Sequence, residues 1–273
     1  NMAISIFRYP GGKIKAVKFI KPFWSQIEHD EYREPFVGGG SVFVAKDNTK
    51  YNWINDLDTD LYSFYKIISS TLQRKKLIDK LLKTKISKKL HNNLFYSKPK
   101  KQFDKAYRYY VLNRTSFSGI TKWNSYIGDV RFNIHRSKKL INEFGMKLAK
   151  TKITNIDFEE VIKEKPVGKK GVFYFLDPPY AESRQIAAYN IHFEKSDHER
   201  LAKLLKNLNH PFLLTYDDCR YVRSLYKWAN FYDRTWTYSV ANSKVHHNPR
   251  ESGNELFISN FKLKENLKLL WQE

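Results

Sequence analysis

The stretch Val172–Tyr180, which reads VFYFLDPPY, decides the fold. Its first five residues form an unbroken apolar run, which is typical of a strand buried on both faces of a parallel sheet. The prolines of Asp177-Pro178-Pro179 end this strand, because they offer no backbone N–H groups and disfavour helical geometry before them. In doubly wound sheets ligands bind beside the carboxyl ends of the strands, so a binding site is predicted at Asp177.

The tetrapeptide Asp177-Pro178-Pro179-Tyr180 has the groups that would hold a planar base with an exocyclic amino group. Asp177 and the free carbonyl of Pro178 are two acceptors, and Tyr180 offers a flat ring beside them. Accepting both N–H bonds would favour a pyramidal nitrogen and stabilise the positive charge that grows as this nitrogen attacks an electrophile. The alternative is a strand-ending turn in which Asp177 caps a neighbouring segment.

A glycine turn precedes this site in the chain, within Glu34–Ser41 (EPFVGGGS). Gly38 and Gly40 can adopt positive φ and bring bare backbone against a ligand. Asp56 follows Gly38 by 18 residues, where an acid commonly binds ribose hydroxyls. Phe43 stands where a dinucleotide fingerprint would have its third glycine, so a nucleoside ligand without phosphates is favoured; a simple tight turn is the alternative.

S-adenosylmethionine has the properties that both motifs require. It carries no phosphate, and its sulfonium methyl group transfers directly to a nucleophile in line with it. We expect Asp56 to bind its ribose and the glycine turn to hold its methionine part, an orientation that lowers the barrier to transfer. A base inside a duplex cannot reach such a pocket, so the target must be flipped out or single-stranded.

Strands and helices alternate around these motifs. This alternation predicts an α/β fold with a doubly wound, Rossmann-like sheet, which residues 66–150 interrupt as an inserted, mostly helical domain. We expect strands at residues 32–37, 51–54, 172–176, 212–216 and 255–261, and helices at 41–46, 59–69 (capped by Asp58 or Thr59) and 196–207 (with a capping box of Ser196 and Glu199).

The interrupting segment carries most of the charge. The 273 residues include 49 Lys and Arg against 28 Asp and Glu, a net charge of +21. Residues 66–150 hold 22 basic and 4 acidic residues, so they contribute +18 and the remainder +3. A regional basic surface with interleaved aromatic rings favours a nucleic-acid partner; solvated lysine-rich helices are the alternative. The rings are those of Phe95, Tyr96, Phe103, Tyr107, Tyr109, Tyr110, Phe117, Trp123 and Tyr126.

Composition excludes several classes of protein. No apolar run approaches the ~18–20 residues that a membrane span needs. We expect no signal peptide, and the single cysteine, Cys219, cannot form an internal disulfide. His246 and His247 lack nearby Cys or acidic ligands, so no metal is expected. These features predict a folded, cytoplasmic, nucleic-acid-directed protein with neither membrane nor metal.

With these motifs in this order, the sequence resembles the Dam-type family of DNA adenine N6-methyltransferases. The resemblance covers nearly the whole chain. It implies an S-adenosylmethionine-dependent enzyme that methylates a flipped adenine in double-stranded DNA, with residues 1–65 and 151–273 as the catalytic domain and 66–150 as the target-recognition domain. Its best marks are Tyr9–Lys13 (YPGGK), Glu34–Ser41, Asn55-Asp56, Asp177–Tyr180, and Leu112-Asn113-Arg114 with Ser118-Gly119.

The resemblance also implies roles for single residues. Tyr9 and Lys13 would contact the cofactor from an N-terminal segment that closes over it. The family often has tryptophan where Tyr9 stands. Asp157 and Phe158 would contact the adenine of the cofactor, for which a helix cap by Asp157 is the alternative. Asp177 would lie between cofactor and target adenine.

Within the recognition domain, Arg114, Phe117, Ser118 and Lys122 are the expected DNA contacts. Family members that read GATC commonly have an arginine where Lys122 stands, and lysine lacks its two-pronged donor geometry. GATC is therefore not predicted. Phe117 would wedge or stack in the duplex, with packing in the core as the alternative.

Two loops and several alternatives complete the interpretation. Residues 181–193, with Tyr189 and Phe193, would form a lid or a wall around the flipped base, and residues 239–253 a hairpin loop at the DNA. Other readings are an RNA adenine or cytosine-N4 methyltransferase, or a catalytically silent DNA-binding module, against which the intact Asp56 and Asp177 argue. The enzyme would be an orphan or work beside a cognate restriction endonuclease.

Overall fold

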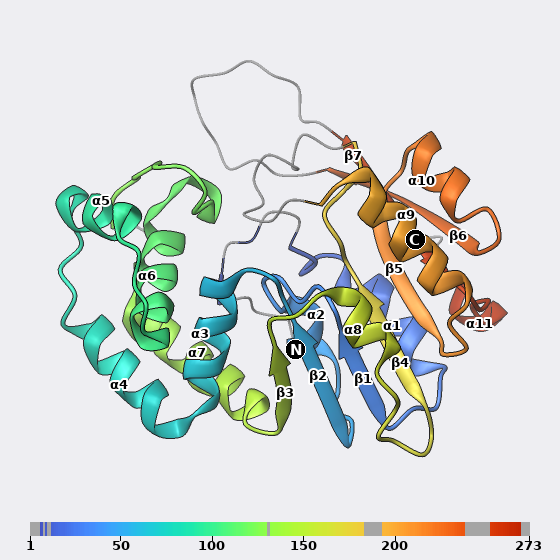
Figure 1. Ribbon diagram of the computed structural model, residues 1–273, viewed down its shortest axis with the longest axis horizontal. Coiled ribbons are helices and arrows are strands. Elements are labelled where there is room, and N and C mark those ends of the chain that lie inside the picture. Colours follow the sequence, from blue (N-terminus) through green and yellow to red (C-terminus); the bar gives the residue numbers. More distant parts are fainter. Residues whose placement is uncertain are drawn as a thin grey trace.

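The computed structural model describes residues 6–7, 9, 12–129, 132–182, 193–237 and 252–268. A seven-stranded sheet in the order β3-β2-β1-β4-β5-β7-β6 forms the centre of this part of the chain (Figure 1). Neighbouring strands among β1–β5 pair in parallel, and β7 runs antiparallel to β5 and β6. The strands are β1 (Glu31–Glu34), β2 (Tyr51–Asn55), β3 (Thr151–Thr154), β4 (Val172–Leu176), β5 (Phe212–Asp217), β6 (Asn230–Thr237) and β7 (Ser252–Ser259).

This sheet confirms the predicted doubly wound, Rossmann-like fold. The apolar run Val172–Leu176 is β4, whose five residues are all buried between β1 and β5. Most of the expected strands agree with the structure to within one to three residues at their ends. The late strand begins at Ser252 rather than at residue 255, because it pairs along its whole length with β6.

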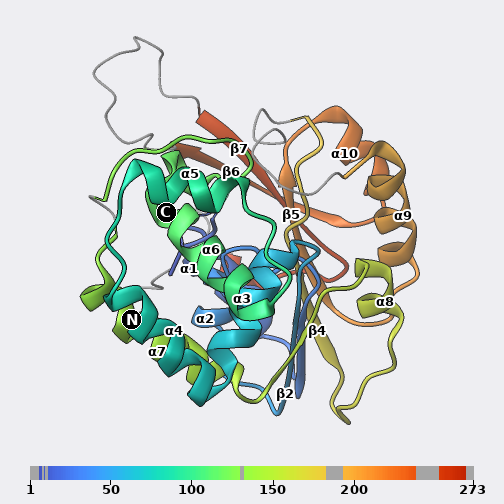
Figure 2. The same ribbon diagram turned by 60° about the vertical axis from the view of Figure 1, so that its left-hand side comes forward.

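Helices lie on both faces of the sheet (Figure 2). They are α1 (Val17–Ser25), α2 (Ser41–Ala45), α3 (Thr59–Ser69), α4 (Thr71–Leu82), α5 (Lys88–Tyr96), α6 (Gln102–Thr115), α7 (Ile134–Leu148), α8 (Phe158–Lys163), α9 (Lys195–Lys206), α10 (Arg220–Leu225) and α11 (Glu265–Lys268), with a short 3-10 turn at Phe117–Gly119. Asp58 caps α3 as expected, since its carboxylate accepts from the backbone N–H groups of Asp60 and Leu61. The capping box of α9 is formed by Glu194 and Asp197, not by Ser196 and Glu199, because the N-cap of the helix lies two residues earlier than expected.

Side chains of β4 alternate between two hydrophobic clusters, one on each face of the sheet. Phe173 and Phe175 belong to the cluster that includes α1, α3, α6 and α7, whereas Val172, Tyr174 and Leu176 belong to the cluster of α8, α9 and α10. Successive residues of a strand point to opposite faces. The side chains of β4 therefore contribute to the hydrophobic cores on both faces of the sheet.

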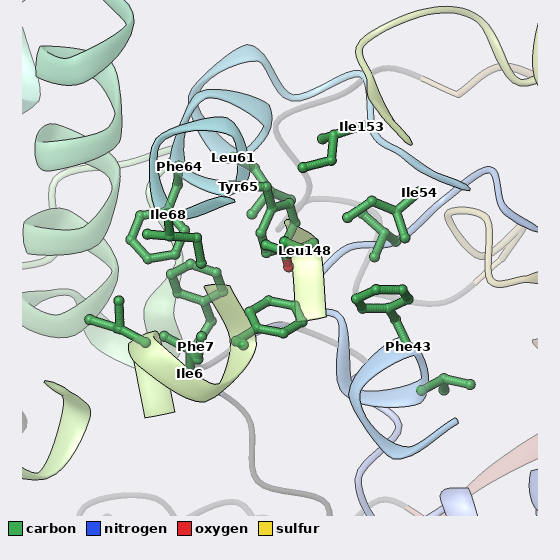
Figure 3. Packing of buried hydrophobic residues seen from close by; sticks show 14 of the residues in the cluster. Ile6, Phe7, Phe43, Ile54, Leu61, Phe64, Tyr65, Ile68, Leu148 and Ile153 are labelled. Atoms are coloured by element: carbon green, nitrogen blue, oxygen red, sulfur yellow. The ribbon is translucent and has the colours of Figure 1, made fainter. Parts of the chain in front are cut away.

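The basic segment is helical and packs onto the first cluster. Helices α4–α7 fall within residues 66–150, and α3 spans the predicted domain boundary. Figure 3 shows one cluster of side chains that extends from α3 through α7 to α2 and β2 and includes Phe64, Ile68, Leu148, Phe43 and Ile54. The recognition and catalytic segments thus share one hydrophobic core; the division into domains stays a prediction.

Three of the aromatic residues that were candidates for stacking on bases are core residues instead. Tyr107, Tyr109 and Tyr110 of α6 are at most 9% exposed, because Tyr109 and Tyr110 pack against Phe64 of α3 and Tyr107 lies against Lys80 of α4. Tyr96, Phe117 and Trp123 are 72%, 50% and 42% exposed and remain available to a ligand.

Candidate active site

A cavity opens at the carboxyl ends of β1, β2 and β4. It brings together both motifs that the sequence singled out, the glycine turn and the tetrapeptide that ends β4. The residues that line it are Tyr9, Gly12, Lys13, Glu34, Pro35, Phe36, Val37, Gly38, Gly39, Ser41, Val42, Asn55, Asp56, Leu57, Asp58, Phe158, Phe175, Asp177, Pro179 and Phe193.

Asp56 is bonded directly to the glycine turn. One carboxylate oxygen accepts from the backbone N–H of Gly38 (2.9 Å) and the other from that of Asp58 (2.9 Å). The side chain is buried, and burial raises the pKa of Asp56 to about 7. These bonds explain why an acid at the end of β2 accompanies a glycine at the end of β1: the two meet at adjacent strand ends.

The two positive-φ glycines of the turn have different neighbours. Gly38 has φ +47°, and a Cβ built on it would lie 2.7 Å from a ring carbon of Tyr9, so the Tyr9 ring packs on the turn. Gly40 has φ +68°, and its Cβ would lie 2.8 Å from the Phe144 ring of α7. Gly40 was expected at the cofactor, but this side of it faces the basic helices, and it is not among the described residues that line the cavity.

Three phenylalanines form one end of the cavity. The ring centroids of Phe36, Phe158 and Phe193 lie 5.3–5.8 Å from one another, an arrangement suited to a flat aromatic ligand. Asp157 caps α8 through the N–H of Glu159 and makes two bonds to Arg200 (2.7 and 2.9 Å). The helix-cap alternative for Asp157 is therefore realised. Among the described residues it is Phe158, not Asp157, that lines the cavity.

Asp177 lies in a network of buried charges and does not cap a neighbouring segment. Its Oδ1 accepts from Thr215 Oγ1 (2.7 Å) and contacts Lys13 Nζ (2.9 Å). Burial raises the pKa of Asp177; the Lys13 ammonium opposes this shift and the Glu255 carboxylate reinforces it. Lys13 was expected at the cofactor, and although it lines the cavity, its ammonium is held by this carboxylate.

The other members of the tetrapeptide differ in exposure. Pro179 lines the cavity. Tyr180 is 4% exposed, and its hydroxyl donates to Glu255 and accepts from Lys13 Nζ (3.0 Å), so the ring is fixed in place. The role of the Pro178 carbonyl as an acceptor for the target amino group stays a prediction.

Sequence reasoning missed Thr215, Asp217 and Glu255. Asp217 accepts from the backbone N–H groups of Ala181 and Glu182 (2.8 Å each) and so orients the chain after the tetrapeptide. A polar residue within an apolar strand was the available signal: Thr215 interrupts the run of β5, and Glu255 precedes Leu256–Ile258 in β7. Because Asp177 and Tyr180, which these side chains contact, are distant in sequence, the polar residues alone did not indicate a role at the site.

The recognition residues surround a closed turn at the end of α6. The side chain of Asn113 donates a hydrogen bond to the carbonyl of Gly119 (3.0 Å), and Ser116 forms an isolated antiparallel β-bridge with Tyr126. These interactions hold Phe117–Gly119 as a turn. Ser118 has φ +51°, an uncommon conformation for a residue with a side chain.

The side chains around this turn are open to a ligand. Phe117 is half exposed, which rules out the core-packing alternative. Lys122 is exposed and lines a surface hollow with Asp58 and Arg108, and Arg114, at the end of α6, is half-buried. The turn therefore presents Phe117 and Lys122 together.

Some expectations fall outside the described residues. These include Pro10 and Gly11 of the N-terminal motif, Tyr189 in the loop after the tetrapeptide, and His246 and His247 in the late loop. In the described ranges, no group of three His, Cys, Asp or Glu side chains could hold a metal ion. No described helix combines the length and the apolar character of a membrane span.

Comparison with known proteins identifies the family. The chain is 27% identical to the type II methyltransferase M.CviBI of Paramecium bursaria Chlorella virus NC1A over 81% of its own length and 85% of that protein. It is 23% identical to the DNA adenine methylase of Vibrio cholerae, over 82% and 85% of the two chains. It is 29% identical to the DNA N-6-adenine-methyltransferase of Escherichia phage P1, of which it spans about a third.

The family model of D12 class N6 adenine-specific DNA methyltransferases matches residues 9–240, from Tyr9 at the cavity to the end of β6 and just beyond. This match confirms the family that the motifs predicted, the adenine-directed activity and DNA as the substrate. The chain belongs to the D12 class of N6 adenine-specific DNA methyltransferases.

Proposed function

We propose that this chain uses S-adenosylmethionine to methylate a flipped adenine of double-stranded DNA, with Asp177 at the reacting nitrogen. The observation that carries the proposal is one cavity lined at once by the glycine turn, by Asp56 and by Asp177. A methyl donor on the turn and an acceptor nitrogen at Asp177 would meet within it.

The cavity fits this cofactor on its own residues. The Phe36, Phe158 and Phe193 rings suit the adenine of the cofactor, the buried carboxylate of Asp56 suits ribose hydroxyls, and bare backbone at Gly38 and Gly39 suits the methionine part. No phosphate site is required. When bound, the cofactor supplies an electrophilic methyl group on a positively charged sulfur.

The residues of this chain would position and stabilise the acceptor. Oδ1 of Asp177 is held by Thr215 and Lys13, which leaves Oδ2 to accept an N–H of the target amino group. The adenine nitrogen forms the new N–C bond with its lone pair while the electrons of the S–C bond stay on sulfur. The nitrogen then loses one proton, for which Asp177 is the acceptor in this proposal. A fixed carboxylate facing the growing positive charge is a typical large contribution to catalysis.

The DNA would be held by the basic helices, with Phe117 and Lys122 near the recognised bases. The exposed positions of both residues support this assignment. A cognate restriction endonuclease remains a prediction, which the name of the similar type II methyltransferase M.CviBI supports.

The test is methyl transfer from labelled S-adenosylmethionine to duplex DNA by wild type and Asp177→Ala. We expect the single-turnover rate to fall about a thousandfold, with duplex binding retained within about threefold because the basic helices, not Asp177, would bind the phosphates. Glu265→Gln, which alters an exposed carboxylate on α11, is the control and should keep full activity. An Asp177→Ala enzyme with near wild-type transfer would overturn the site assignment.

A further inference from the structure

Lys13 is enclosed by the side chains of three residues, which come from two parts of the chain distant from it in sequence. Its Nζ lies 2.9 Å from Asp177 Oδ1, 3.0 Å from Glu255 Oε1 and 3.0 Å from the Tyr180 hydroxyl, and its ammonium lies 5.1 Å from the centroid of the Tyr180 ring. Lys13 is 5% exposed and Glu255 is 3% exposed. Ion pairs in such positions interact strongly, because water screens them little.

The sheet topology explains how Glu255 arrives there. Because β7 is antiparallel to β5, residues near its beginning lie at the edge where the parallel strands end, and Glu255 pairs in register with Asp217. Glu255 shares a face with Phe257, and Thr215 shares it with Leu213; both apolar residues belong to the cluster that contains α1. Glu255 thus lies on the face on which Lys13, just before α1, approaches Asp177.

The charges of this cluster do not cancel. When Lys13, Asp177 and Glu255 are ionised, they carry one positive and two negative charges, a net charge of −1. Without Glu255, Lys13 and Asp177 would form a neutral pair, and the ammonium would oppose the positive charge that grows on the target nitrogen. Removing one partner of a buried pair also leaves the remaining charge without compensation.

We propose that Glu255 is a positioning residue for methyl transfer, which shares the Lys13 ammonium with Asp177 so that the cluster as a whole stays negative toward the target amino group. Glu255 also accepts the hydrogen bond of Tyr180 and so holds that ring at the same site. The inference rests on the proposed role of Asp177. It adds to that role a carboxylate that acts on the reaction without touching the substrate.

The first test is Glu255→Gln, which keeps the shape and the hydrogen-bonding groups but removes the charge. With cofactor and a duplex both saturating, the single-turnover rate should fall about ten- to hundredfold. Cofactor and duplex affinities should stay within about threefold of wild type, so that the change lies in the rate and not in binding. Glu265→Gln removes an exposed carboxylate and should leave the rate unchanged.

The second test restores the net charge of the cluster. Lys13→Met with Glu255→Gln leaves Asp177 alone, again at −1, so the double variant should transfer methyl groups faster than Glu255→Gln. Tyr180→Phe removes only the hydroxyl bond and should cost less than Glu255→Gln. If Glu255→Gln does not fold, as judged by its melting curve, the double variant lacks the ammonium that would remain with one carboxylate, and its rate should equal or exceed that of Lys13→Met.

The outcomes separate this inference from the proposed function. A Glu255→Gln enzyme with wild-type rate, or a double variant whose loss equals the product of the two single losses, would overturn the role of Glu255. Loss of activity in Asp177→Ala alongside either result would leave the proposed function standing. An active Asp177→Ala enzyme would overturn both.

Discussion

Lys13 and Lys122 represent two regions that use the same kind of residue in opposite ways. Lys13, at the carboxyl edge of the sheet, is 5% exposed and contacts two carboxylates. Lys122, beyond the end of α6, is exposed and makes no ion pair with a described residue. At the sheet edge the charged side chains are buried against one another, and burial raises the pKa values of Asp56 and Asp177. In the basic helices the charges together attract the DNA backbone, so the affinity for DNA should fall steeply as the salt concentration rises.

The two regions nevertheless share a structural contact. The glycine turn at the cavity packs against α7 of the basic segment through Gly40 and Phe144. A change at this contact should disturb both regions, whereas changes at Asp56 or Lys122 should disturb only one.

The largest effect is expected for Gly40→Ala. The new Cβ would overlap Phe144 and crowd the Tyr65 hydroxyl at a positive φ, so we expect a loss of about 3 kcal/mol in the free energy of unfolding. Gly128→Ala is the matched control. Gly128 also has positive φ, but a Cβ built on it would have no atom of the described residues within 4 Å beyond its chain neighbours, so backbone strain alone should cost about 1–2 kcal/mol. Equal losses in urea titrations of the two variants would show that the contact of Gly40 with α7 contributes nothing.

Asp56→Asn tests the cofactor end of the sheet edge. The amide cannot accept as the carboxylate does, and we expect cofactor affinity to fall about ten- to hundredfold, as for hydrogen bonds to a charged group. Duplex binding should be unchanged. Isothermal titration would contradict the assignment if the variant bound S-adenosylmethionine as tightly as wild type.

The same residue predicts a pH dependence of binding. The pKa of Asp56 is raised to about 7 by burial, and ribose hydroxyls donating to the carboxylate favour its ionised form. Wild-type affinity should therefore decrease as the pH falls from 8 to 6, and Asp56→Asn should lose most of this dependence. Glu34, whose pKa burial raises to about 8, also lines the cavity, so Glu34→Gln is the control that should keep the part due to Asp56.

The smallest effect is expected for Lys122→Ala. If Lys122 contacts a base, discrimination at one position of the recognition sequence should fall by about 1 kcal/mol or more, with little change in non-specific binding. Lys139→Ala, which removes an exposed lysine of α7, should instead weaken all sequences alike and reduce the salt slope by about one. Sequencing of methylated sites distinguishes the two patterns, and the second pattern at Lys122 would make it a phosphate contact.

Much of the fold was predictable because its signals are local. The buried run of β4, the alternation of strands and helices, and the cap of α3 by Asp58 each depend on residues close in sequence. The positions of Gly38, Asp56 and Asp177 at one cavity followed from a rule about parallel strands, whose carboxyl ends share an edge. The predicted capping box of α9 was wrong by two residues, because the N-cap is Glu194 and not Ser196.

The sequence by itself determined the family, the order of the motifs, the regional charge and the residues at the strand ends. Only the tertiary structure decided which contacts the side chains make. It places Gly40 against α7, buries three tyrosines of α6 in the core, and brings Lys13 into contact with both Asp177 and Glu255. Lys13 and Glu255 are 242 residues apart. An antiparallel strand inserted into a parallel sheet brings them together, and no local pattern records that pairing.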